Sequence, residues 1–165
     1  MQRRTGVTAV GPSALRGQRK GVLKIIQAYL GILDLSQIPS TQDEYTAWLD
    51  EHTNALLKKL RIRNRPWGAA RKALNLFMRD ALYNKYLDDH YRIYRIESFM
   101  EVPLDSAVAK GLKRRAGRGR LPYWPGLKNL KPEISAIFQK YAAEYAKTKD
   151  AARVHLDVYL WLENR

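Results

Sequence analysis

The chain has 165 residues, a length that suits one domain with its own hydrophobic core. A hydrophobic fraction of 45% excludes a disordered chain, which lacks the apolar side chains that offset the entropy cost of ordering. The net charge is +14, from 30 Lys and Arg against 16 Asp and Glu, and a chain this basic attracts polyanions. The absence of cysteine excludes disulfides, cysteine-ligated zinc, iron–sulfur clusters and a thiol nucleophile.

The N-terminal third predicts a loose arm followed by two helices. Residues 1–13 are basic and contain glycine and proline, which favours a flexible arm, and 14–165 is expected to form a single domain. Residues 15–33 are apolar enough for a buried helix. Thr41 and Glu44 have the spacing of a capping box, and a helical period of apolar residues follows them as far as Leu60.

The middle of the chain predicts three more helices. After a short link at 61–67, one apolar stripe marks a helix, with Ala70, Ala73, Leu74, Phe77, Met78, Ala81 and Leu82 along it. A further helix is expected at 89–100, ended by Pro103. Asp105 then stands at the N-cap position of a helix that reaches about Arg115.

The C-terminal third predicts a loop and two helices. Residues 116–129 are rich in Gly, Pro and Arg, which indicates a loop. Helical spacing then appears at Ile134, Ile137, Phe138, Tyr141, Ala142 and Tyr145. The closing segment, 151–162, is apolar on most sides and is expected in the core. Since no run alternates as a strand does, the chain predicts an all-α, compact multi-helix bundle.

The positive charge is clustered. Two segments without a carboxylate, 52–79 and 106–132, contain 16 of the 30 cations. A shared phosphate target would explain both, although an ordinary solvated basic surface would too. The residues expected to bind DNA are Arg61, Arg63, Arg65, Gly68, Ala70, Arg71, Arg79, Lys110, Arg114, Arg115, Arg118 and Arg120.

The segment 67–80 carries the most information about function. A tight cationic turn opens directly into a helix, whose first amides lack internal partners and can bind a phosphate. Small residues at Gly68 and Ala70 let a DNA backbone approach closely. A tightly packed helix corner would explain the same small residues.

This segment resembles the hairpin of the helix-hairpin-helix (HhH-GPD) DNA glycosylases, and in particular their bifunctional 8-oxoguanine DNA glycosylase/AP lyase branch. That hairpin reads Gly-x-Gly-x-Lys: Gly68 matches the first glycine, Ala70 replaces the second, and Lys72 falls on the lysine. The run 77–80, Phe-Met-Arg-Asp, is similar to the Phe-Leu-Arg-Asn that follows the lysine in one subgroup.

Two later segments continue the resemblance. The run 102–108 resembles the family's Pro-Val-Asp-Thr-His-Val, with Asp105 on the catalytic aspartate and Ala107 in place of the histidine. The run 155–161 is similar to a late helix of the 8-oxoguanine enzymes. Lys72 and Asp105 are 33 positions apart, more than the family normally shows, and the expected helix at 89–100 accounts for the insertion.

The resemblance implies a base-excising enzyme that breaks an N-glycosidic bond. Asp105 would stabilise the positive charge that develops on the sugar. Lys72 would attack C1′ and form a Schiff base, which permits strand cleavage by β-elimination. Without that step, Asp105 and a water molecule would give a simple hydrolase. Taken alone, Asp105 could be only an N-cap, and Lys72 only a solvated helix lysine.

Such an enzyme must rotate its target nucleotide out of the duplex, so the expected partner is double-stranded DNA with a flipped base, bound by a monomer. Tyr123 and Trp124 are candidates for a wedge or stacking surface, and packing of their loop is the alternative. Asp157, in an apolar helix, is interpreted as a buried residue that holds the bundle.

No cofactor is expected. The three histidines, His52, His90 and His155, have no metal-ligand spacing, which favours structural or surface roles. No apolar run predicts a signal peptide or a membrane span, so the expected location is an interior compartment that contains nucleic acid, such as the cytoplasm. Two other functions fit the charge: a helix-hairpin-helix module that binds duplex DNA without chemistry, and a bundle that binds RNA or protein.

Overall fold

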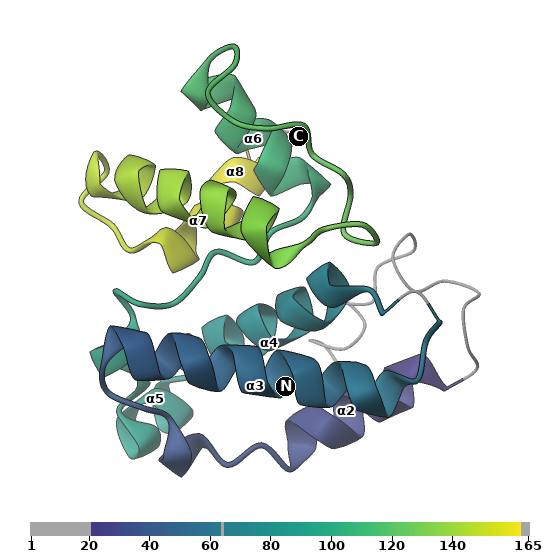
Figure 1. Ribbon diagram of the computed structural model, residues 1–165. Helices are drawn as coiled ribbons and strands as arrows, with labels where there is room; N and C mark the ends of the chain where they lie inside the picture. Colours follow the sequence, from purple (N-terminus) through teal and green to yellow (C-terminus); the bar gives the residue numbers. More distant parts are fainter. Residues whose placement is uncertain (1–20, 64, 163–165) are drawn as a thin grey trace.

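The computed structural model describes residues 21–63 and 65–162, which form an all-α bundle (Figure 1). This confirms the predicted fold class, and no strand occurs in these two ranges. The predicted arm, 1–13, lies outside them. The helices are α2 (Val22–Gly31), η1 (Leu35–Gln37), α3 (Gln42–Leu60), α4 (Trp67–Leu82), α5 (Lys85–Tyr91), η2 (Ile93–Ile96), α6 (Ser106–Ala116), α7 (Pro132–Lys147), η3 (Arg153–His155) and α8 (Leu156–Leu162).

Helices α3, α4, α6 and α7 lie where the sequence places them. Thr41 is the N-cap of α3, but its hydroxyl donates to the Glu44 carboxylate at 2.7 Å instead of capping a backbone amide. Pro132 occupies the first turn of α7, where its missing N–H costs no hydrogen bond. In the described part of the chain, no helix has both the length and the apolar composition needed to cross a bilayer.

The predicted single helix at 89–100 is wrong. Helix α5 begins earlier, at Lys85, and ends where Arg92 adopts a left-handed conformation with φ of +53°. The short helix η2 follows and buries Ile93 and Ile96, whereas none of the residues of α5 is buried. After this break, Ile93 and Ile96 pack in the hydrophobic core.

The prediction for the C-terminal helix also needs correction. Residues 151–162 form η3 and α8, and α8 buries only Leu156, Asp157 and Leu160. Four apolar side chains on its other sides are between 42% and 61% exposed: Val158, Tyr159, Trp161 and Leu162. The helix therefore packs along one face and does not lie inside the core.

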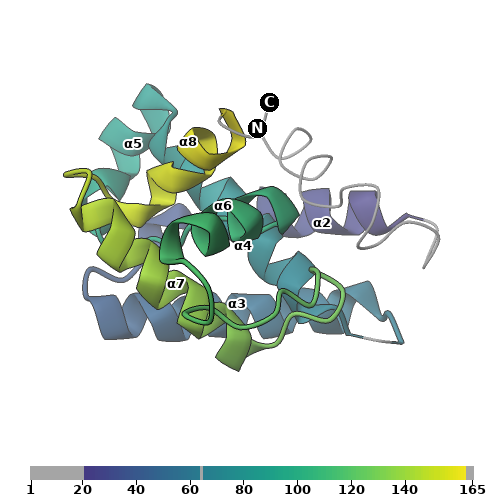
Figure 2. The ribbon, with the colours of Figure 1, turned by 90° about the horizontal axis from the view of Figure 1, so that it is seen from above.

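Two hydrophobic clusters make up the core. The first is built by α2, α3, α4 and η2, and the second by α6, α7, α8 and the loop before α7. Figure 1 shows these as two layers, and in Figure 2, seen from above, α6 lies over α4 while α7 crosses α3. Helix α4 lies between them and is buried at every residue from Gly68 to Met78. The link 97–105 carries the chain from the first layer to the second.

At Gly68, helix α4 packs directly against the loop before α7. A Cβ atom at this position would lie 2.6 Å from the carbonyl oxygen of Leu127 and 2.7 Å from Cβ of Leu130. The backbone of the loop before α7 therefore requires a glycine here. This supports the packed-corner explanation of the small residues in 67–80.

We expect Gly68→Ala to lower the free energy of unfolding by about 1–3 kcal/mol, because the added methyl group meets backbone that cannot move aside. Alanine's better helix propensity, up to about 1 kcal/mol, offsets only part of that loss. Gly31→Ala, at the end of α2, is the matched control, since nothing lies within 4 Å of its Cβ position. Urea denaturation measures both variants, and equal stabilities would contradict the close approach.

Candidate active site

The structure brings Lys72 and Asp105 together. Lys72 lies in the second turn of α4, and Asp105 precedes the first turn of α6. Lys72 Nζ donates to Asp105 Oδ2 at 3.2 Å, and the two side chains are 10% and 30% exposed. The inserted helix α5 lies beyond the far end of α4 and leaves the pair intact (Figure 1).

The two oxygens of Asp105 have different partners. Oδ1 accepts hydrogen bonds from the backbone amides of Ala107 and Val108, both at 2.9 Å, which is N-cap geometry. Oδ2 faces Lys72. The capping role and the lysine pairing are therefore compatible, because the cap fixes the carboxylate in a single orientation with its second oxygen toward the amine.

Both side chains line a cavity of about 350 Å³ between α4, α6 and α8. This volume is at the small end of the range for small-molecule sites, roughly 300 to 1,000 Å³. The wall combines four charged residues with apolar ones. It consists of Lys72, Leu76, Arg79, Pro103, Asp105, Val108, Asp157, Val158, Trp161 and Leu162.

A second ion pair, Arg79 with Asp157, lies in the same wall. Arg79 also contacts Asp80 at 2.9 Å. Burial raises the pKa of Asp157, and the charge of Arg79 opposes this without cancelling it. Oδ1 of Asp157 is buried and has no hydrogen-bond partner among the described residues. An entering ligand could supply that partner.

Sequence reasoning missed the place of Asp157 in the cavity. The interpretation that it is buried and holds the bundle fits its pairing with Arg79, but the same carboxylate also faces the space beside Lys72. The available signal was a carboxylate within an otherwise apolar helix, since an ionisable group is retained there only when it has a partner or a function.

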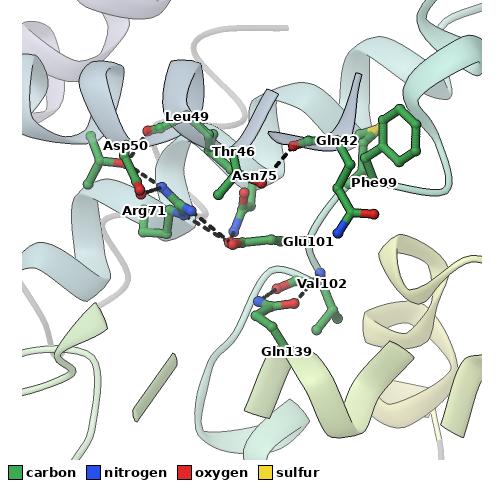
Figure 3. A network of polar contacts seen from close by, with 12 residues as sticks. Gln42, Thr46, Leu49, Asp50, Arg71, Asn75, Phe99, Glu101, Val102 and Gln139 are labelled. Carbon is green, nitrogen blue, oxygen red and sulfur yellow. Dashed lines mark hydrogen bonds and ion pairs between the residues drawn. The ribbon is translucent and has the colours of Figure 1, made fainter. Parts of the chain in front are cut away.

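Glu101, four residues before Asp105, is held in place by side chains of α4 in the first layer (Figure 3). The Glu101 carboxylate accepts two hydrogen bonds from the Arg71 guanidinium and one from the Asn75 amide, each at 2.9 Å. Arg71 also donates to Asp50 at 2.6 Å. Burial would raise the pKa of Glu101, but the hydrogen bonds and charge of Arg71 outweigh it, so the pKa lies below its ordinary value.

The second layer fixes the neighbouring backbone. Gln139 of α7 accepts from the Val102 amide at 3.0 Å and donates to the Val102 carbonyl at 2.8 Å (Figure 3). Arg153 donates to the carbonyls of Phe99 and Met100 at 2.8 and 2.9 Å. Because both layers hold residues 99–102, the start of α6 and the Asp105 carboxylate have a defined position over Lys72.

Several residues predicted to contact DNA are buried or paired within the protein. Gly68 and Ala70 are buried, and the amides of Ala69 and Ala70 donate to the Pro66 carbonyl, so this turn does not offer them to a phosphate. Arg71 is 5% exposed and is bonded to Asp50 and Glu101. Arg79 faces the cavity. These charges have structural partners that the sequence does not reveal.

The remaining predicted contacts lie nearer the surface. Arg61, Arg63 and Arg65 are exposed between α3 and α4, and Lys110, Arg114, Arg118 and Arg120 are exposed on α6 and the loop after it. Arg115 is half-buried and donates to the Tyr145 hydroxyl at 2.7 Å. Tyr123 is 82% exposed, whereas Trp124 packs edge-on against Phe138 and donates to Ser106.

Two of the histidines form hydrogen bonds within the protein, and His90 packs edge-on against the Tyr91 ring. His52 bonds to the Tyr29 hydroxyl at 2.7 Å, and His155 lies between the Tyr83 hydroxyl and the Glu97 carboxylate, each at 2.7 Å. Across the ranges 21–63 and 65–162, no cluster of His, Asp and Glu could hold a metal ion. A larger hollow of about 650 Å³ borders His155, but neither Lys72 nor Asp105 lines it.

Comparisons with family models, with curated proteins and with solved structures find no match to this chain.

We expect Glu101→Gln to lower the free energy of unfolding by about 3 kcal/mol, since it leaves a buried guanidinium without its main counter-charge. Asp50→Asn removes the other partner of Arg71, but Asp50 is 52% exposed, so we expect a loss of no more than about 1 kcal/mol. Guanidinium chloride denaturation compares the two, and equal losses would contradict the central role of Glu101.

The ion pair between Arg71 and Glu101 also predicts that the stability of the protein depends on pH. Because the pKa of Glu101 is lower in the folded state, its contribution is complete above the unfolded pKa and is lost as pH falls through the folded pKa. The stability difference between the wild type and Glu101→Gln should therefore shrink in acid. A difference that stays constant down to about pH 3 would contradict this.

Proposed function

We propose that this protein is a DNA glycosylase that removes a modified base, with AP lyase activity through Lys72. The observation that carries the proposal is an amine and a carboxylate at 3.2 Å in the wall of one cavity. These are the two groups that such a reaction needs, and they come from the two layers of the fold. The resemblance of 67–80 and 102–108 to the glycosylase family supports the same roles.

The geometry allows a balanced reaction. Lys72 passes one ammonium proton to Asp105, and the resulting amine attacks C1′ of the nucleotide. The bond from C1′ to the base breaks, its electron pair leaves with the base, and Asp105 passes its proton to the departing nitrogen, which restores the carboxylate. The ring bond from C1′ to O4′ then breaks, a proton passes from Nζ to O4′, and a Schiff base between C1′ and Nζ remains. Loss of a C2′ proton from this species expels the 3′-phosphate, which cuts the strand.

Asp105 contributes charge as well as proton transfer. Positive charge develops on the sugar as the base departs, and a fixed carboxylate next to C1′ stabilises it. Its orientation is set before the substrate binds, since the amides of Ala107 and Val108 hold the other oxygen. A preoriented group spends little energy on reorganisation during the reaction.

The cavity suits a base that has left the helix stack. Arg79 and Asp157 offer a donor and an acceptor to the edge of a base, and Val158, Trp161 and Leu162 offer apolar surface to its faces. Under this proposal, the exposed apolar side of α8 forms the edge of the cavity past which a flipped nucleotide enters. The alternative is a module that binds DNA without chemistry, and the experiment below separates the two.

We expect Asp105→Asn to slow base release at least about a hundredfold while duplex binding is retained. Asparagine caps helices about as well as aspartate, so α6 should remain folded and the change isolates the negative charge. The measurement is free base released from a panel of duplexes that each contain one modified base, including 8-oxoguanine. Undiminished release by the variant, or no release from any duplex by the wild type, would refute the assignment.

We expect Lys72→Gln to abolish the covalent adduct with DNA that borohydride reduction traps in the wild type. Lys131→Gln is the matched control, because Lys131 is exposed at the start of α7, away from the cavity. An adduct that persists in Lys72→Gln would assign the nucleophile to another amine. Base release without any adduct in the wild type would reduce the activity to simple hydrolysis.

A further inference from the structure

A second hollow, of about 710 Å³, opens on the side of α6 that faces the loop after it. We call it the α6 groove. Its lining includes four cations and, among the described residues, no carboxylate. It consists of Ser106, Lys110, Lys113, Arg114, Gly117, Arg118, Gly119, Leu121 and Trp124.

The α6 groove begins beside the candidate active site. Asp105 and Val108 line the cavity, while Ser106 and Lys110 line the groove, so one helix separates the two. From Ser106 to Gly117 the groove follows α6 for about 16 Å, at 1.5 Å per residue. At a rise of 3.4 Å per nucleotide, that length corresponds to about five stacked nucleotides of one strand.

The groove combines charge with an apolar floor. Leu121 is only 7% exposed, and Trp124 is fixed beside it by its contact with Phe138 and its hydrogen bond to Ser106. Lys110, Arg114 and Arg118 are exposed around this floor. A base-paired duplex would present phosphates to the cations but keep its bases away from the floor. An unpaired strand satisfies both, since its bases rest on apolar and aromatic surface while its phosphates meet the cations.

We propose that the α6 groove binds unpaired DNA next to the excised nucleotide, so that the protein grips a short opened stretch of one strand rather than a single flipped base. The position of that stretch relative to the cavity rests on the proposed function. The affinity of the groove for single strands does not depend on it.

The test is the affinity for a fluorescent, undamaged single-stranded oligonucleotide, measured by anisotropy over a range of salt concentrations. The double variant Lys110→Gln, Arg118→Gln should flatten the plot of log affinity against log salt by about 1.4, from two lost contacts at 0.7 each. This corresponds to about 25-fold weaker binding at ~0.1 M salt, if the lines meet at ~1 M. The loss for an intact duplex should be smaller.

The matched control is Lys85→Gln, Arg95→Gln, which removes one lysine and one arginine from exposed positions on α5 and η2. Helix α5 lies at the opposite end of the molecule from α6 (Figure 1). We expect the affinity of this control variant for the oligonucleotide to stay within about twofold of the wild type, because distant surface charges are screened by salt. Equal losses in the two double variants would overturn the proposal, and so would an equal loss for the duplex.

Trp124→Phe supplies a second readout that keeps an aromatic ring against Phe138. Stacking of a base on Trp124 should quench its fluorescence, so the quench caused by the oligonucleotide should largely disappear in this variant. An unchanged quench would place the bases elsewhere and overturn the proposal. All these measurements use undamaged DNA, so the groove can fail while base release succeeds, and base release can fail while the groove stands.

Discussion

The buried ion pair between Arg71 and Glu101 is the interaction on which the candidate site depends. It joins α4, the helix that carries Lys72, to the link that leads into α6, the helix that Asp105 caps. Both side chains are nearly buried, at 6% and 13% exposed, so neither can be left unpaired without a large penalty. The lysine and the aspartate inherit their spacing from this contact, because each lies within four residues of one of its partners.

Helix capping and packing, more than propensity, decide where the site residues lie. The amides at the start of α6 hold one oxygen of Asp105, and Gln139 holds both backbone groups of Val102. Gly68 lets the loop before α7 approach α4 within contact of its backbone. Together these contacts hold the second layer against α4 near Lys72. Helices α4, α6 and α8 then form three sides of the cavity.

Much of the fold followed from the sequence, because period and caps are local. Thr41 and Asp105 marked the starts of α3 and α6. The break at Arg92 could not be predicted, since a left-handed arginine leaves no composition signal. Nor could the pairing of Arg71 with Asp50 and Glu101, or of Arg79 with Asp157, since these partners lie 21 to 78 positions away. Lys72 and Asp105 were singled out by resemblance alone, and their contact is a property of the tertiary structure.

The two hollows on either side of α6 differ in the charge of their linings, and this difference bears on the ligands proposed for them. The cavity contains two cations and two carboxylates in close pairs, so its field is nearly balanced and a phosphate would find no net attraction there. An uncharged base with polar edges suits such a wall, since it can bond to the pairs without separating them. The lining of the α6 groove has an excess of positive charge, which under the proposal would attract phosphates. A nucleotide next to α6 would thus be divided by charge, with its base drawn into the balanced cavity and the backbone retained outside on the cationic surface.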